Sequence, residues 1–216
     1  MDAVTRPACR LVVFDFDGTL ADTFPWFCGV LNEVADRFGF RRVAAHEIDT
    51  LRGLDAHGVL KQLGVPLWKV PAIARHMHGL AARDAGTMRL FPGIPEMLAA
   101  LQAQGLALAL LSSNTEANVR RVLGPEAAAR IGHYACGAAL FGKARRLQAL
   151  LRRCGVPPGA ALSIGDEIRD WEAARAVGCR FGAVGWGYTR ADALAARGPD
   201  LLLSRPEALL EALVPA

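Results

Sequence analysis

The sequence predicts the α/β fold class, with a mostly parallel sheet and an α-helical insertion. Short, continuous apolar runs alternate with longer amphipathic stretches along most of the 216 residues. Strands of this kind are typical of parallel sheets that helices cover on both faces. Residues 22–89, in contrast, show helical periodicity without a convincing strand. We therefore expect a Rossmann-like core into which a helical cap is inserted.

The apolar runs and helical patterns place the elements in order along the chain. The expected strands are Leu11–Phe16, Leu106–Leu111, Tyr134–Ala139 as the weakest, Ala160–Ile164, Phe181–Val184 and Leu201–Leu203. The expected helices between them are Ile94–Gln104, Thr115–Leu123, Ala144–Cys154 and Trp171–Val177. Glycine and proline signals divide the insertion into about four helices. The core would then comprise residues 1–21 and 90–216, and the cap residues 22–89.

Composition excludes several classes of protein. An apolar fraction of 52% and a mean hydropathy of +0.23 exclude intrinsic disorder. No apolar run approaches the roughly 18 to 20 residues of a membrane-spanning helix. The net charge of +4 is divided evenly between the insertion and the rest, so it predicts no concentrated nucleic-acid surface. Five scattered cysteines without a CxxC pair fit a reducing compartment. We expect a cytoplasmic monomer or homodimer, with neither membrane nor nucleic acid as a partner.

The first motif that carries chemistry follows the first strand, in the run DFDGT that contains Asp15, Asp17, Gly18 and Thr19. Two carboxylates emerge where a buried apolar strand ends, and isolated charges there need a cationic partner. Gly18 permits a tight turn and lets the backbone approach a ligand closely. This motif therefore predicts a functional loop.

Small polar residues, Ser112, Ser113 and Asn114, follow the second strand. Hydroxyl groups and free N–H groups at a strand-to-helix junction suit a phosphate. The same residue types are also ordinary helix caps, so this motif alone leaves both roles open.

Lys143 stands near the start of an expected helix, where the helix dipole favours anions over cations. The mismatch makes sense if the ammonium points at a bound anion or at a carboxylate. Because the chain has 22 arginines and only 3 lysines, a lysine here suggests a need for a compact charge.

A second group of acids, Asp166, Glu167 and Asp170, follows the strand Ala160–Ile164. Helix capping would explain Asp166 or Asp170 singly, but not why acids recur after separate strands. With the acids of the first motif, at least four carboxylates could converge at one edge of the sheet. Clustered oxygen ligands of this kind suit Mg²⁺.

Taken in order, the motifs DFDGT, Ser-Ser-Asn, Phe-Gly-Lys and Gly-Asp-Glu-x-x-Asp resemble the haloacid dehalogenase-like hydrolase superfamily. Within it, the chain is similar to the phosphoglycolate phosphatase-like branch with a small helical cap. The resemblance implies a Mg²⁺-dependent phosphatase. Its substrate would be a small phosphorylated metabolite, phosphoglycolate-like or a sugar phosphate, hydrolysed through an aspartyl-phosphate intermediate.

The resemblance also implies a role for each motif residue. Asp15 would be the nucleophile, and Asp17 the general acid and then the general base. Ser112 would hold the phosphoryl group together with Lys143, and Ser113 is the alternative hydroxyl. Further phosphate-binding residues would be Gly18, Thr19, Ser113 and Asn114. The metal ligands would be Asp15, Asp17 through its carbonyl oxygen, Asp166, and Asp170 or Glu167 in support.

The cap gives weaker signals. Arg52, beside Gly53, is a candidate specificity residue, whereas Lys61 and Lys69 are more simply interpreted as exposed cations. His76 and His78 diverge around a helix, which favours the surface over a metal site.

Three alternatives use the same fold. A phosphosugar mutase or a phosphonate hydrolase could share the core. The phosphonate hydrolase would need a lysine of the cap to form a Schiff base with its substrate. A non-catalytic module could bind a phosphate ligand, although the intact Asp15, Asp17, Lys143 and Asp166 argue against it.

Overall fold

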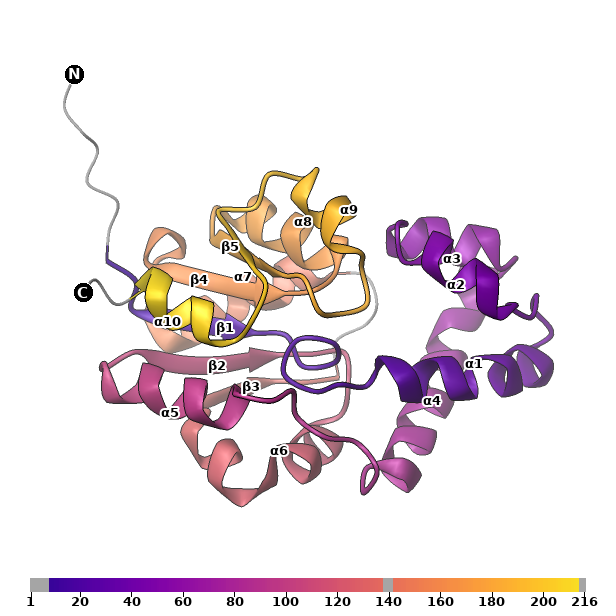
Figure 1. Cartoon of the computed structure of the whole chain (residues 1–216), viewed down its shortest axis with the longest axis horizontal. Helices are drawn as coiled ribbons and strands as arrows, with labels where there is room; N and C mark the ends of the chain where they lie inside the picture. The colour runs from indigo at the N-terminus through magenta and orange to yellow at the C-terminus, as the bar shows by residue number, and fades with distance from the viewer. Residues whose placement is uncertain (1–7, 138–141, 214–216) are drawn as a thin grey trace.

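The computed structural model describes residues 8–137 and 142–213 and confirms the α/β fold (Figure 1). Its sheet has six parallel strands in the order β3-β2-β1-β4-β5-β6. The strands are β1 Leu11–Phe14, β2 Ala107–Leu111, β3 His133–Ala135, β4 Ala161–Gly165, β5 Arg180–Val184 and β6 Leu201–Leu203. β1 lies between β2 and β4, and the chain winds outward from it in both directions. The crevice beyond the carboxyl ends of such strands is where α/β proteins bind ligands.

Helices cover both faces of the sheet, because alternate side chains of each strand point to opposite sides. Val12 and Phe14 of β1 pack in one apolar cluster with α5, α6 and α10, and Leu11 and Val13 pack in another with α7, α8 and α9. Figure 1 shows these helices as layers above and below the sheet. Their bounds are α5 Ile94–Ala103, α6 Glu116–Arg130, α7 Lys143–Cys154, α8 Ile168–Val177, α9 Ala191–Ala195 and α10 Glu207–Leu213.

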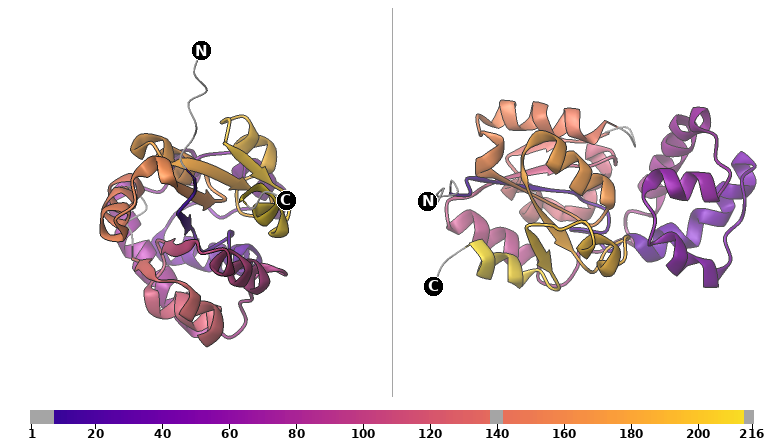
Figure 2. Two further views of the ribbon diagram at one scale, coloured as in Figure 1. Left: turned by 90° about the vertical axis from the view of Figure 1, so that its left-hand side faces the viewer. Right: turned by 90° about the horizontal axis from the view of Figure 1, so that it is seen from above.

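The insertion between β1 and α5 is helical, as its periodicity predicts. Its α-helices are α1 Phe24–Phe38, α2 Ile48–Leu51, α3 Ala56–Gln62 and α4 Val70–Asp84, with 3₁₀ turns at Ala45–Glu47 and Leu67–Lys69. They form a group beyond the carboxyl ends of the strands (Figure 2). The chain enters and leaves the group through adjacent segments, since Asp22 N donates to Arg89 O (2.9 Å) and Phe91 N to Leu20 O (3.0 Å). We call residues 22–89 the helical insertion.

Most expected elements are present with small shifts in their ends. The helix expected at Thr115–Leu123 continues to Arg130 through a kink, because Gly124 adopts φ 72° and Pro125 follows it. α8 begins at Ile168, three residues before the expected start. Of the weakest strand expectation, Tyr134–Ala139, the observed strand keeps Tyr134 and Ala135, while residues 138 and 139 lie outside the described residues. The short helices α9 and α10 were not expected.

The division of the chain into two domains at residues 22 and 89 stays a prediction. In the described ranges, no helix is both long enough and apolar enough to span a membrane.

Candidate active site

The motif residues meet at the carboxyl ends of the three central strands. Asp15 directly follows β1, Ser112 follows β2, and Asp166 follows β4. The strands run in register, so Asp15 N donates to Ile164 O of β4 at 2.8 Å. Parallel pairing therefore brings together residues that lie between 54 and 151 positions apart in the chain, as the sequence predicts.

Lys143 joins two of the carboxylates. Its Nζ lies 3.0 Å from Asp15 Oδ1 and 2.5 Å from Asp170 Oδ1, and all three side chains are at least nine-tenths buried. Lys143 is the first residue of α7, after Gly142 in the left-handed conformation. The start of a helix is unfavourable for a cation, but Lys143 can occupy it because the carboxylates of Asp15 and Asp170 face its ammonium. Phe141 of the Phe-Gly-Lys motif lies outside the described residues.

Burial dominates the electrostatics of these groups. It raises the pKa of Asp15 to about 7, although the Lys143 ammonium opposes the shift and Asp170 adds to it. Burial also raises the pKa of Asp17, against hydrogen bonds that include one from Asn114. For Lys143, burial disfavours the charge, but Asp15 and Asp170 outweigh it and the pKa lies above its ordinary value. The ammonium therefore stays protonated beside Asp15.

Asp166 is held on both of its oxygens. Thr19 Oγ1 donates to Oδ1 at 2.6 Å, and Tyr188 N donates to Oδ2 at 2.8 Å. Gly18 and Gly187 pack against this carboxylate so closely that a Cβ at either position would lie 2.2 Å from one of its atoms. Burial, followed by the charge of Glu167, places the pKa of Asp166 well above its ordinary value. These contacts fix the side chain without giving it a cationic partner.

The acids can hold a metal ion. Asp15, Asp166 and Asp170 each offer a carboxylate oxygen, and these oxygens lie within 4.8 Å of one another. Asp15 Oδ2 is buried and accepts no hydrogen bond from the described residues. With Lys143, the three carboxylates sum to two negative charges when ionised, which a divalent cation would balance. The donor set therefore fits Mg²⁺, which prefers oxygen ligands.

The serines and Asn114 lie beside the acids, but in different settings. Asn114 Nδ2 donates to Asp17, 3.2 Å from Oδ2, and the residue is buried. Ser112 is also buried, and its Oγ accepts from Asn114 N at 3.0 Å. Ser113 is half-buried and lines the cavity in front of the site. Asn118, which the sequence analysis missed, donates from Nδ2 to Asn114 Oδ1 (3.1 Å) and so orients that amide.

Three backbone N–H groups at these strand ends, those of Phe16, Asp17 and Ser113, find no hydrogen-bond acceptor in the described part of the chain. Backbone N–H groups without an acceptor at a strand end can donate to an anion. The N–H groups of Gly18 and Thr19 instead donate within their own loop, to Ala21 O (2.9 Å) and Phe16 O (3.2 Å).

The Thr19 hydroxyl is committed to Asp166 as well. Because these donors are already used within the chain, the expected role of Gly18 and Thr19 in binding phosphate stays a prediction. No residue type could reveal this, because the pairing of a loop amide depends on how the loop folds back.

Glu167 and Arg169 form a pair at the mouth of the site. Arg169 Nε lies 2.7 Å from Glu167 Oε2, and Nη2 lies 2.8 Å from Oε1. Glu167 N donates to Asp170 Oδ2 (3.1 Å), so Asp170 both caps α8 and binds Lys143. The helix-capping interpretation and the active-site interpretation of Asp170 therefore hold together.

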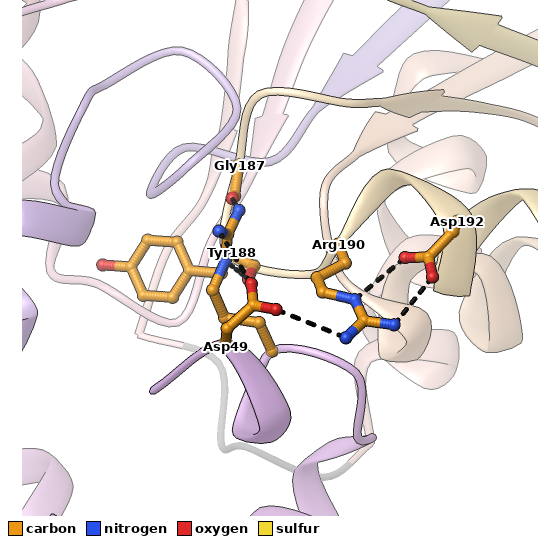
Figure 3. Close-up of polar contacts among 6 residues, drawn as sticks. Asp49, Gly187, Tyr188, Arg190 and Asp192 are labelled. Atoms are coloured by element: carbon orange, nitrogen blue, oxygen red, sulfur yellow. Dashed lines mark hydrogen bonds and ion pairs between the residues drawn. The ribbon is translucent and has the colours of Figure 1, made fainter. Parts of the chain in front are cut away.

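The insertion contacts the loop between β5 and α9, and Figure 3 shows Gly187, Tyr188 and Arg190 of that loop beside Asp49 of the insertion. Arg52 makes part of this contact. Its Nε donates to Tyr188 O and its Nη2 to Gly187 O, both at 3.0 Å. Around it, Arg190 Nη1 lies 3.4 Å from Asp49 Oδ2, and its other nitrogens bind Asp192. The Arg52 guanidinium thus holds the same loop whose Tyr188 N–H donates to Asp166. A role for Arg52 in specificity stays a prediction.

A cavity of about 350 Å³ lies between the strand ends and the insertion, and Asp17, Ser113, Asn114 and Tyr188 line its mouth. The other cap candidates relate to it differently, as their contacts show. Lys61 is exposed, and Lys69 donates to Phe38 O (2.7 Å); neither lines the cavity.

The expected surface placement of the two histidines is only partly correct. His76 and His78 are both half-buried, with His76 beside the Phe38 ring and His78 lining the cavity. Neither belongs to a cluster of potential metal ligands among the described residues.

Comparisons with known proteins agree with this geometry. The family model described as haloacid dehalogenase-like hydrolase matches residues 12–184. The phosphoglycolate phosphatase of Synechococcus elongatus is 32% identical over 94% of this chain and 96% of its own. The tyrosine-protein kinase PtkA of Mycobacterium tuberculosis is 30% identical over 85% of this chain and 64% of its own. A solved haloacid dehalogenase-like hydrolase of Streptococcus pneumoniae superposes with a TM-score of 0.78 at 20% identity, covering 94% of this chain and 98% of its own.

Proposed function

The chain belongs to the haloacid dehalogenase-like hydrolase family, and on that premise we propose that it is a Mg²⁺-dependent phosphomonoesterase. The observation that carries the proposal is Asp15. Its carboxylate is buried, one oxygen faces Lys143, and the other accepts no hydrogen bond from the described residues. An anionic oxygen held in this way is available to attack an electrophile. In this proposal residues 22–89 act as a cap over the site.

The reaction begins with attack of Asp15 Oδ2 on the phosphorus of the substrate. A bond forms between that oxygen and phosphorus, and the bond from phosphorus to the alcohol oxygen breaks. Asp17 gives its proton to the departing alcohol, for which its raised pKa is suited. Water then attacks the aspartyl-phosphate while Asp17 takes a proton from it, and inorganic phosphate leaves with Asp15 restored.

Several groups of the chain would hold the phosphoryl oxygens during both steps. The N–H groups of Phe16, Asp17 and Ser113, which have no acceptor among the described residues, would be preorganised donors, and Lys143 supplies a positive charge beside Asp15. Asn114 holds the Asp17 carboxylate through Nδ2. Ser112 and Ser113 stay alternative hydroxyl donors, with Ser113 lining the cavity.

Mg²⁺ bound by Asp15, Asp166 and Asp170 would supply the positive charge that lets an anionic nucleophile meet an anionic phosphate. Lys143 contributes to the same balance by neutralising Asp15 and Asp170 in part. Thr19 and Tyr188 keep Asp166 in place for this task.

The substrate would be a small phosphorylated metabolite, and phosphoglycolate or a sugar phosphate are the candidates that the family branch suggests. The name of the Synechococcus relative supports phosphoglycolate. A phosphonate hydrolase with a cap lysine as Schiff base receives no support, because Lys61 and Lys69 do not line the cavity.

The test is phosphate release from p-nitrophenyl phosphate and from phosphoglycolate, each with Mg²⁺ and with EDTA. We expect hydrolysis with Mg²⁺ and its loss with EDTA. Rapid quenching followed by peptide mass spectrometry should find the phosphoryl group on Asp15. Full activity in EDTA would contradict the metal requirement, and a phosphoryl group on another residue would contradict the mechanism.

A further inference from the structure

The cavity in front of the site reaches from the catalytic carboxylates into the helical insertion. Asp17, Ser113 and Asn114 line it at the strand ends, and side chains of all four insertion helices line the rest. Its volume of about 350 Å³ is in the range of sites that bind small molecules, roughly 300–1,000 Å³. A group that leaves the phosphorus on the Asp17 side would therefore enter the insertion.

The part of the cavity within the insertion is apolar. Aromatic and branched side chains such as Trp26, Phe27, Phe40 and Ile73 line it and are only half-buried. These side chains pack against two small buried clusters, one around Leu31 and one around Val34, and both of those residues also line the cavity. The apolar interior of the insertion is therefore partly open to the cavity. Covering this apolar surface with an apolar group of a ligand lowers the free energy.

The two arginines that line the cavity already donate to other groups of the chain. Arg52 donates to the carbonyl oxygens of Tyr188 and Gly187, and Arg169 is paired through two nitrogens with Glu167. His78 is the remaining lining residue of the described chain that can carry a positive charge. A carboxylate buried here would lose its hydration, and to pair with Arg52 it would have to displace hydrogen bonds that this side chain already makes, which is unfavourable.

We propose that this cavity binds the alcohol part of the substrate and that this part is apolar. The preferred substrates are then phosphomonoesters of extended alkyl or aromatic alcohols, and phosphoglycolate, a candidate from the family resemblance alone, is hydrolysed less efficiently than these esters. The inference rests on the proposed function, because it takes the phosphoryl group to lie at Asp15. The insertion selects the substrate by burying its apolar part next to Asp17.

A series of n-alkylphosphonates, from ethyl to octyl, tests the inference without any variant. These probes cannot be hydrolysed, so calorimetry with Mg²⁺ measures their binding to the full chain. We expect Kd to fall about two- to fourfold for each added methylene until the cavity is filled. A matched carboxylate probe, 3-phosphonopropionate, should bind more weakly than propylphosphonate. Equal Kd values for ethyl- and octylphosphonate, or tighter binding of the carboxylate probe, would overturn the proposal.

Two alanines of α4 provide a matched pair of variants. Ala74 lines the cavity, whereas Ala72 is equally half-buried and does not. Ala74→Phe should weaken octylphosphonate binding about tenfold or more and leave ethylphosphonate unchanged, which also shows that the variant is folded. Ala72→Phe should change neither. If a folded Ala74→Phe protein bound octylphosphonate with unaltered Kd, the octyl group would lie outside the cavity and the inference would be overturned.

Hydrolysis of n-hexyl and ethyl phosphate separates this inference from the proposed function. Both are esters of primary alcohols, so the leaving groups differ in apolar area rather than in acidity. A kcat/KM that favours the hexyl ester supports the inference, and an equal value contradicts it while leaving the phosphatase intact. If no ester, including p-nitrophenyl phosphate, is hydrolysed, the proposed function fails and the phosphonate series still decides the inference.

Discussion

The sheet edge and the helical insertion bury their side chains in different ways. At the sheet edge, Asp15, Asp166, Asp170 and Lys143 are nearly inaccessible, and most of their polar atoms have a partner within hydrogen-bonding distance. In the insertion, large apolar side chains such as Trp26, Phe27 and Phe40 stay half-buried around a cavity. The edge is built to hold charge in fixed positions, and the insertion is built to accept an apolar group.

This difference indicates a division of labour. Preorganised charges act on the phosphoryl group, which every substrate would share. An apolar cavity can discriminate between alcohols of different size, but only modestly per methylene. Substitutions at the edge should therefore affect the reaction for all substrates, and those in the insertion should act more weakly and selectively.

The largest expected effect is at the proposed nucleophile. Asp15→Asn should lower kcat/KM for p-nitrophenyl phosphate by about 10⁴-fold or more, because the covalent step is lost. The matched control is Asp36→Asn in the insertion, an exposed carboxylate paired with Arg42, and it should be fully active. Comparable rates in the two variants would show that the sheet edge does not carry the chemistry.

Lys143 comes next. Lys143→Met should lower kcat/KM about 10²- to 10³-fold, since a positive charge beside Asp15 is lost. It should also lower the free energy of unfolding of the metal-free protein by about 3–5 kcal/mol, because two buried carboxylates lose their partner. Denaturant titration measures the second effect. Lys61→Met, at an exposed position, is the control that should leave both quantities unchanged.

A smaller effect is expected where the two regions meet. Arg52→Ala removes both hydrogen bonds to the Gly187–Tyr188 loop, whose Tyr188 N holds Asp166. We expect roughly tenfold higher KM, equivalent to about 1.4 kcal/mol, together with a higher Mg²⁺ concentration for half-maximal rate.

The control for Arg52 is Arg190→Ala, because the Arg190 side chain binds Asp49 and Asp192 in the same cluster but no loop carbonyl. Its Mg²⁺ requirement should stay that of the unmodified chain. An unchanged Mg²⁺ requirement in Arg52→Ala would show that the insertion contact does not reach the metal ligand.

The smallest effect is confined to the insertion. Asp84 of α4 binds Arg83 and accepts from Trp26 Nε1 of α1 (3.0 Å), and the bond from Arg83 contributes most to lowering its pKa to about 2. A carboxyl with a depressed folded-state pKa stabilises the fold above its ordinary pKa of about 3.9, and this is lost as pH falls toward 2.

Asp84→Asn should therefore lower the denaturant midpoint slightly at neutral pH, and the difference from the unmodified chain should vanish near pH 2. Trp26→Phe removes one of the same hydrogen bonds from the other side and should make the effect of Asp84→Asn smaller. If the difference in denaturant midpoint between Asp84→Asn and the unmodified chain grew as the pH fell, the stabilising role of the ionised Asp84 carboxylate would be contradicted. Hydrolysis rates at neutral pH should hardly change, in contrast to the sheet-edge variants.

The sequence by itself determined the parts that depend on local pattern and chain order. Apolar runs such as Leu11–Phe14 form strands because their side chains are buried on both faces. Once the strands are parallel, the acids that follow β1 and β4 must lie at one edge of the sheet. Asp15, Asp166 and Asp170 could therefore be predicted to meet from residue type and position, whereas the place of Lys143 beside them followed from the family resemblance.

Only the tertiary structure decided how individual donors are used. Thr19 binds Asp166, 147 positions away, and within the described residues it is the N–H groups of Phe16 and Asp17, rather than that of Gly18, that have no acceptor. Arg52, a candidate specificity residue from the sequence, lines the cavity and also donates to two loop carbonyls, which no pattern along the chain predicts. The cavity is a further example, since apolar periodicity predicts helices equally well for a filled and for an open interior. Hydrogen-bond partners and empty space depend on how distant segments pack, and residue pattern along one segment carries no record of that packing.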